Sequence, residues 1–235
     1  PILGCEVYVA PHSRFDKRAQ LDDSQYHLVL LAENEVGYKN ILRLVSLGFT
    51  EGFYYKPRVD RELLGKYSQG VIALSACLAG EIPQLILNRN FSEAEATALF
   101  YKDIFGPDNF FLEIQDHGIA EQKEVNHHLI TMGKRLGIPL VATNDLHYIS
   151  QSESEIHDVL LCIQTGKTLA DTERMRFPSN EFYLKNAEEM WQLFEYIPEA
   201  LSNTVKIAER CEVKLEFGKL YLPNYEVPEG HTVDT

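Results

Sequence analysis

The chain has 235 residues, of which 45% are hydrophobic and 11% aromatic, and this suffices for one large or two small α/β domains. It contains no apolar run of about 18 residues and no basic-then-apolar signal stretch at its start, so neither membrane insertion nor secretion is expected. The formal net charge of −13 opposes binding to a phosphate backbone. If the chain works on DNA, its neighbours are expected to supply most of the contacts.

Cysteine spacing bounds the cellular compartment. Cys5, Cys77, Cys162 and Cys211 lie far apart and form no CxxC pair. This spacing argues against both a disulfide framework and a zinc ribbon. A reducing cytoplasm is therefore the expected location.

Strands and helices alternate along the first part of the chain. Apolar, β-branched runs predict strands at residues 2–9, 27–32, 70–74, 109–114 and 138–143. Helical patterns lie at residues 35–49, 81–87, 92–105 and 120–136. Ser92 and Glu95 have the spacing of a capping box at the start of the third of these helices. Such alternation indicates parallel strands with right-handed crossovers, hence a doubly wound sheet or a barrel.

From residue 150 onward the pattern changes to helices alone. They are predicted at residues 153–164, 187–194 and 198–211, and a tail containing proline and glycine follows. We interpret this part as closing helices and a connector to another domain. The predicted division is a barrel-like domain over residues 1–180 and a helical connector over residues 181–235.

Polar side chains follow the predicted strands, at the ends where parallel α/β folds form their ligand sites. Asp145 and His147 come directly after the last strand, and residues i and i+2 of an extended backbone project to the same side. A carboxylate and an imidazole so placed suit divalent zinc, manganese or iron. The alternative is that Asp145 caps a following helix while His147 is half buried. Earlier strands supply Glu6, Cys77, Glu113, Gln115 and His117.

Several of these segments, in this order, resemble the PHP (polymerase and histidinol phosphatase) domain, in the form carried by alpha subunits of bacterial DNA polymerase III. The segments are Gly4-Cys5-Glu6, residues 26–32, Ser75-Ala76-Cys77-Leu78 and Thr143-Asn144-Asp145-Leu146-His147-Tyr148. Connecting segments agree as well, at residues 14–16, 37–40, 51–54, 111–115 and 162–167. The resemblance covers nearly the whole chain.

The resemblance implies a distorted, TIM-like (β/α)7 barrel that gathers up to three divalent metal ions at its strand ends. The positions that match the family's ligands are Glu6, His27, Cys77, Asp145 and His147. The family's opening HxH pair and its Thr-Asp-His-Gly segment do not occur in this chain. We therefore expect a fragment of a longer protein, a barrel open at one side for want of its first strands, and weak or incomplete metal binding.

Each candidate also has a simpler interpretation. Glu6 can face solvent at a sheet edge, although burying an unpaired carboxylate is costly, and Cys77 can be an inert core residue. His27 stands at the start of its apolar run rather than at the end, so only the resemblance supports it as a ligand. His117 is slightly better explained as a loop residue than as a donor behind the site. Solvent exposure is expected for His127 and His128, and packing for His157.

The function that the resemblance implies is metal-assisted phosphodiester hydrolysis, used as a 3′ to 5′ exonuclease, with Asp145 and His147 as catalytic residues. The alternatives are a non-catalytic scaffold for polymerase stability and partner docking, and a histidinol-phosphatase-like phosphoesterase. The implied partners are the rest of the polymerase subunit, DNA and other replicase subunits. No glycine-rich phosphate loop is present, and the polymerase's own catalytic carboxylates are expected in a palm domain beyond residue 235.

Overall fold

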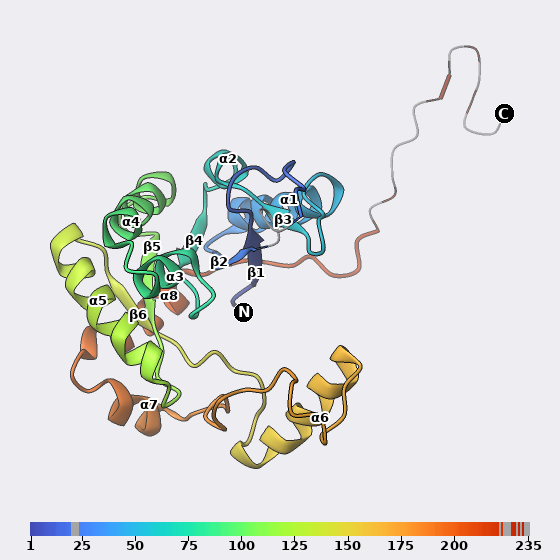
Figure 1. Cartoon of the computed structure of the whole chain (residues 1–235). Helices are drawn as coiled ribbons and strands as arrows, with labels where there is room; N and C mark the ends of the chain where they lie inside the picture. Colours follow the sequence, from blue (N-terminus) through green and yellow to red (C-terminus); the bar gives the residue numbers. More distant parts are fainter. Residues whose placement is uncertain (20–23, 221, 223–226, 229, 231, 233–235) are drawn as a thin grey trace.

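The computed structural model describes residues 1–19, 24–220, 222, 227, 228, 230 and 232. Within these residues six strands form one mixed sheet in the order β3-β1-β2-β4-β5-β6 (Figure 1). The strands are β1 (Gly4–Val9), β2 (Tyr26–Ala32), β3 (Arg58–Val59), β4 (Val71–Leu74), β5 (Phe110–Ile114) and β6 (Leu140–Ala142). All five predicted strands are present, with ends shifted by at most two residues. The two-residue strand β3 was not predicted.

The helices also follow the predicted pattern. They are α1 (Glu35–Thr50), α2 (Arg61–Lys66), α3 (Glu81–Leu87), α4 (Phe91–Phe105), α5 (Ala120–Leu136), α6 (Ser154–Thr165), α7 (Ala187–Phe194) and α8 (Pro198–Arg210), with a short 3-10 helix at Gln151–Glu153. Every predicted helix is confirmed to within one residue at each end, and only α2 was missed. None of the described helices combines the length and apolarity needed to span a membrane.

The direction of β2 differs from the prediction of parallel strands throughout. β2 runs antiparallel to both of its neighbours, β1 and β4, whereas the pairs β1–β3, β4–β5 and β5–β6 are parallel. A parallel pair needs a crossover connection, usually a helix, and the described residues between β1 and β2 contain none. The start of β2 therefore lies at the edge of the sheet where β1, β4, β5 and β6 end.

The two faces of the sheet contact different helices. Leu30, Ala73 and Leu112 belong to the main core, with residues of α1, α4 and α5. The alternate residues point the other way, because side chains along a strand alternate between faces. At one end of this second face, Ile207 and Cys211, from α8 and its end, pack on apolar side chains of β4, β5 and β6. We call this second face the inner face; at its other end it carries the polar residues described below.

The closing helices pack onto the same body. Phe194 and Ala200, from α7 and α8, belong to the main core. Asn203 donates a 2.7 Å hydrogen bond to the carbonyl of Leu140, and Arg210 forms a 2.8 Å ion pair with Glu33. The chain is thus an α/β protein whose described strands form a single sheet edged by β3 and β6. Closure into a barrel and a domain boundary after residue 180 remain predictions.

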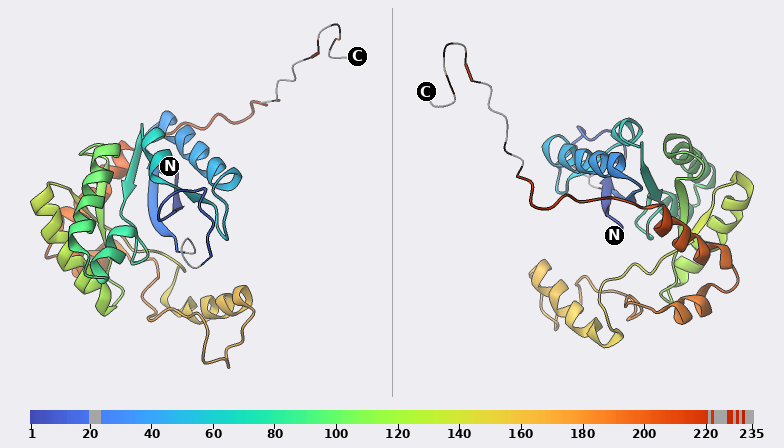
Figure 2. Two further views of the ribbon diagram at one scale, coloured as in Figure 1. Left: turned by 45° about the horizontal axis from the view of Figure 1, so that its top comes forward. Right: turned by 180° about the vertical axis from the view of Figure 1, so that it is seen from behind.

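Helix α6 stands apart from the sheet and its covering helices in all three ribbon views (Figures 1 and 2). The segment that follows it folds back against it. Arg174 forms a two-pronged ion pair with Asp158 of α6, and the contact from its Nη2 measures 2.7 Å. This pair attaches the returning segment to the helix.

The predicted cap of α4 is wrong. The helix begins at Phe91, one residue earlier than predicted, so Ser92 lies inside the first turn and no side chain caps the helix. Asn34, by contrast, caps α1, because its side-chain oxygen accepts hydrogen bonds from the backbone N–H groups of Val36 (3.0 Å) and Gly37 (3.1 Å).

Replacing the two residues should therefore have unequal effects. Asn34→Ala removes the cap of α1 and should lower the free energy of unfolding by about 1 kcal/mol, whereas Ser92→Ala should change it little. Urea unfolding followed by circular dichroism measures both. A larger loss for Ser92→Ala than for Asn34→Ala would contradict the assignment of the caps.

The ion pair on α6 should depend on pH. Its hydrogen bond with Arg174 lowers the pKa of Asp158, so the pair stabilises the fold above the carboxyl's unfolded pKa and loses this contribution as the pH falls through the lowered value. Asp158→Asn should thus be less stable than the wild type at neutral pH, with a gap that closes in acid. Asp103→Asn, an exposed change on α4, is the control. A gap that stays constant with pH would refute the role of this pair.

Candidate metal centre

Glu6 and His27 meet because β1 and β2 are antiparallel. Tyr8 pairs with His27 and Glu6 pairs with Val29, so Glu6 and His27 are diagonal neighbours on the inner face. Glu6 Oε1 lies 3.0 Å from His27 Nδ1. The Tyr8 ring packs edge-on against the imidazole, with 5.3 Å between ring centroids.

Cys77 comes from the loop after β4. Ala76 adopts a left-handed backbone conformation with φ 63°, and the N–H of Gly80 donates to the carbonyl of Cys77 at 2.8 Å. The loop is tied to the start of β2 by a 3.0 Å hydrogen bond from the His27 N–H to the Ala79 carbonyl. This places Cys77 Sγ 3.6 Å from His27 Nδ1.

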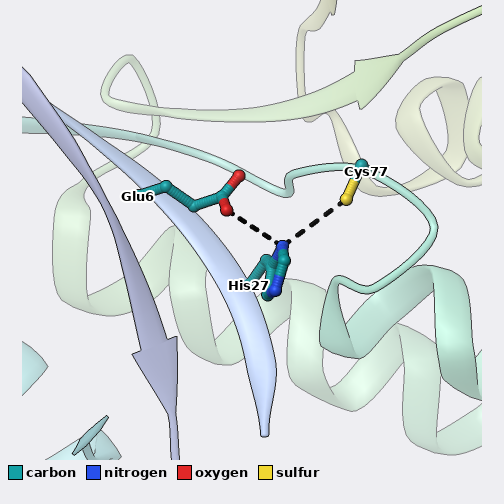
Figure 3. Close-up of side chains that lie close together, drawn as sticks. All are labelled: Glu6, His27 and Cys77. Atoms are coloured by element: carbon teal, nitrogen blue, oxygen red, sulfur yellow. Dashed lines mark hydrogen bonds and ion pairs between the residues drawn. The ribbon is translucent and has the colours of Figure 1, made fainter. Parts of the chain in front are cut away.

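The three side chains converge on one point (Figure 3). One ligand atom from each of Glu6, His27 and Cys77 lies within 4.8 Å of the others. The nitrogen and sulfur ligands of a tetrahedral zinc ion lie about 3.5 Å apart, given Zn–N and Zn–S bonds of about 2.0 and 2.3 Å. The 3.6 Å between Cys77 Sγ and His27 Nδ1 matches this value. The 3.0 Å between Glu6 Oε1 and His27 Nδ1 is somewhat shorter. The donor set therefore fits a divalent metal.

The same contacts raise the pKa of His27 to about 10, because Cys77 and Glu6 both hydrogen-bond its ring, Cys77 most strongly. Such a site favours positive charge, either a proton on the imidazole or a cation held by all three groups.

A second chemical possibility is a cysteine nucleophile activated by a histidine. In that arrangement the nucleophile and the orienting acid bind opposite nitrogens of the imidazole. Here the carboxylate and the thiol both approach Nδ1 of His27 (Figure 3). The geometry is that of ligands around a shared centre and not that of a catalytic triad.

The predicted pair Asp145 and His147 faces the same cavity, of about 320 Å³, as Glu6, His27 and Cys77. Both lie outside the group that meets within 4.8 Å. Burial raises the pKa of Asp145.

The extended backbone predicted between Asp145 and His147 is not found. β6 ends at Ala142 and Asp145 is left-handed, with φ 43°, so the backbone between the two residues is not extended. His147 Nδ1 instead lies 2.8 Å from the backbone carbonyl of Asp145 and 4.0 Å from its carboxylate. The alternative that Asp145 caps the next helix also fails, because Ser150 holds that position. The side chain of His147 is 34% exposed.

Glu113 is a buried residue behind the cavity that was not singled out as a ligand. Its carboxylate accepts hydrogen bonds from the N–H of Ala76 at 3.0 Å, from Gln115 Nε2 at 2.9 Å and from the hydroxyl of Thr143. Burial raises its pKa. The signal that marks it in the sequence is an acid inside an apolar strand, the same signal that marks Glu6.

His117 is fully buried, contrary to the expectation of a simple loop residue. Its ring stacks on Phe182 with 4.0 Å between centroids, and its Nε2 lies 2.7 Å from the carbonyl of Asn144. It follows β5 in a loop, but Gln122 holds its other nitrogen at 2.8 Å, so it supports the segment that carries Asp145. Burial lowers its pKa.

The remaining histidines agree with their simpler interpretations in most respects. His127 is exposed, whereas His128 is half buried and stacks on Phe91. His157 packs against the rings of His147 and Tyr148.

Comparison with known proteins gives a consistent result. Residues 1–117 match the family model of the PHP domain. The chain is 50% identical over 228 residues to the DNA polymerase III subunit alpha of Treponema pallidum, covering 97% of this chain and 20% of that protein. The subunit of Borreliella burgdorferi is 47% identical over 230 residues, again 97% of this chain and 20% of the relative. That of Thermus aquaticus is 48% identical over 240 residues, 99% and 20% respectively.

The chain spans about a fifth of the length of these relatives. Through residues 1–117 it belongs to the PHP domain family, and over nearly its whole length it is similar to part of the DNA polymerase III alpha subunit.

Proposed function

We propose that the chain contributes a metal-dependent phosphoesterase site, with Glu6, His27 and Cys77 as the central ligands. The observation that carries this proposal is the approach of a carboxylate and a thiol to one imidazole nitrogen, at 3.0 and 3.6 Å. Nitrogen, oxygen and sulfur donors together suit zinc or iron, and manganese if oxygen ligands dominate. Asp145 and His147 line the same cavity and are the further ligands of this proposal.

A divalent cation held there supplies Lewis acidity for phosphodiester hydrolysis. The chain's own residues orient the reaction. Asp145 and His147 line the cavity beside the central three. We assign them the catalytic role of ligands that would hold the cation against the reacting phosphodiester group. His117 fixes the backbone immediately before Asp145 through its contact with the Asn144 carbonyl.

In the intact protein we propose a 3′ to 5′ exonuclease within the alpha subunit of a replicative DNA polymerase. We propose that this DNA-directed polymerase is cytoplasmic and that its nucleotidyl-transfer site lies outside these 235 residues. DNA and the other replicase subunits are the proposed partners. We also propose that, with further strands from the intact protein, the sheet closes into a seven-stranded barrel. The inner face, with the ligands at one end and α8 at the other, would then line its interior. Residues 181–235 then lead toward the polymerase palm.

A non-catalytic scaffold is the second candidate, and one feature favours it. Along α6 the apolar residues Ile156, Leu160 and Ile163 follow helical spacing and are 61%, 57% and 72% exposed. Exposed apolar faces of this kind mark docking surfaces. Similarity to polymerase subunits over nearly the whole chain argues against the third candidate, a free-standing histidinol-phosphatase-like enzyme.

Cobalt(II) should report the thiolate directly. A protein loaded with Co²⁺ should show a sulfur-to-cobalt charge-transfer band in the near ultraviolet, and Cys77→Ser should abolish it because the only thiol of the three-residue cluster is then lost. Cys5→Ser, which removes the neighbour of Glu6 on the opposite face of β1, is the control and should keep the band. A band that survives Cys77→Ser would place the metal elsewhere.

Asp145→Asn tests the hydrolytic function in the intact polymerase subunit. Loss of the carboxylate charge should reduce digestion of single-stranded DNA by about 100-fold or more, while DNA synthesis by the same preparation stays normal and serves as the internal control. Unchanged digestion in this variant would reject the catalytic assignment and favour the scaffold.

A further inference from the structure

The loop that carries Cys77 and the loop that carries Asp145 are joined through one buried side chain. Glu113, in β5 between them, accepts from the N–H of Ala76 at 3.0 Å on one side and from the hydroxyl of Thr143 on the other. Its own N–H donates to Ser75 Oγ at 2.8 Å. A single residue of the sheet thus contacts both loops. Its partners are Ala76, one position before Cys77, and Thr143, two positions before Asp145.

Both loops contain a residue in a conformation that needs outside support. Ala76 and Asp145 have φ values of 63° and 43°, in the left-handed region that residues other than glycine rarely adopt. Such conformations persist only where the surroundings hold them, and they concentrate at functional sites. The hydrogen bond from Ala76 to Glu113 is a direct restraint of this kind.

The carboxylate of Glu113 is committed to these bonds. The residue is 5% exposed, and among the described residues it forms no ion pair with a basic side chain. Oε2 accepts from Ala76, and Oε1 accepts from Gln115 (2.9 Å) and Thr143. Three donors make a buried carboxylate tolerable without a counter-charge. Hydrogen bonds thus engage both of its oxygens, and two of the three donors, Ala76 and Thr143, belong to the two loops.

We propose that Glu113 is a positioning residue, which holds the Cys77 and Asp145 loops in register so that their side chains reach the same cavity. This inference rests on the proposed metal-binding function of that cavity. Groups behind the ligands set their direction, and removing such groups typically weakens metal binding without removing a ligand.

Three variants separate this role from simple stability. Glu113→Leu keeps a similar volume but accepts no hydrogen bond. Thr143→Val removes the hydroxyl that links Glu113 to the Asp145 loop, and with it the 3.2 Å bond from Gln115 Nε2 to that hydroxyl. Glu113→Gln should rescue most of the function, since its amide oxygen can accept from Ala76 while its NH₂ donates to Thr143. Gln115 can then turn its amide, because its Oε1 has no partner among the described residues.

Asp60→Asn is the matched control. Asp60 is also a buried carboxylate, 3% exposed, and it also holds backbone and side-chain donors, at 3.0 Å from Arg14 and 3.1 Å from Leu63. It does not line the cavity. Its replacement should lower the melting temperature and leave metal affinity unchanged.

The measurement is the Zn²⁺ dissociation constant of each folded variant, by competition with a chelating dye. Glu113→Leu should weaken binding by about 10- to 100-fold, Thr143→Val should weaken it by less, and Glu113→Gln should stay near the wild type. Equal affinities for the wild type, Glu113→Leu and Thr143→Val would overturn the inference. So would a loss of affinity in Asp60→Asn as large as that in Glu113→Leu.

A second readout needs no metal. The rate at which a thiol reagent modifies Cys77 in the metal-free protein, with Cys5 replaced by serine, reports the placement of its loop. Release of the loop in Glu113→Leu should change this rate, and Asp60→Asn should not. If the wild type binds no Zn²⁺, the proposed function fails while this rate still decides the positioning role; an unchanged rate would refute it. If Glu113→Leu does not fold, Glu113→Gln and Thr143→Val carry both measurements.

Discussion

The candidate site depends on the antiparallel direction of β2. Because this strand runs against β1 and β4, its first residues lie at the edge where the other strands finish. His27 therefore stands between the acid of β1 and the thiol of the loop after β4, and receives both at one nitrogen. A parallel β2 would carry His27 to the far edge of the sheet, and no shared centre would form.

The inner face of the sheet combines an apolar and a polar environment. At one end Ile207 and Cys211 cover apolar side chains, and at the other end Glu6, His27 and Glu113 present charged or polar groups. Buried groups of this kind are costly unless they are hydrogen-bonded or coordinated. Glu113 is provided for by three donors. Glu6 and His27 contact each other, His27 also contacts Cys77, and all three line the cavity.

Most of the fold was predictable from the sequence, because helices and strands follow local periodicity, which is why the ends of α3, α5 and α7 were predicted to the residue. The direction of β2 was not, since strand direction depends on how the connections run and not on the strand's own residues. From the sequence, the position of His27 at the start of its strand did not fit a ligand at the strand ends. The antiparallel direction of β2 explains it.

The residues of the site divide in the same way. Glu6, His27 and Cys77 were identified through family resemblance, and their convergence is a property of the folded chain. Asp145 and His147 line the same cavity as these three, but the extended backbone expected between them is absent, because β6 ends at Ala142 and Asp145 is left-handed. Glu113 and His117 were noticed at a strand end, but their roles depend on partners more than 25 positions away, Thr143 and Asn144, which no local pattern reveals.

X-ray absorption spectroscopy at the zinc edge of the Zn²⁺-loaded protein tests the central claim most directly. The account predicts one sulfur neighbour at about 2.3 Å, with nitrogen and oxygen neighbours at about 2.0 to 2.2 Å. A first shell without sulfur, or one made of several sulfurs, would contradict a centre built on Glu6, His27 and Cys77.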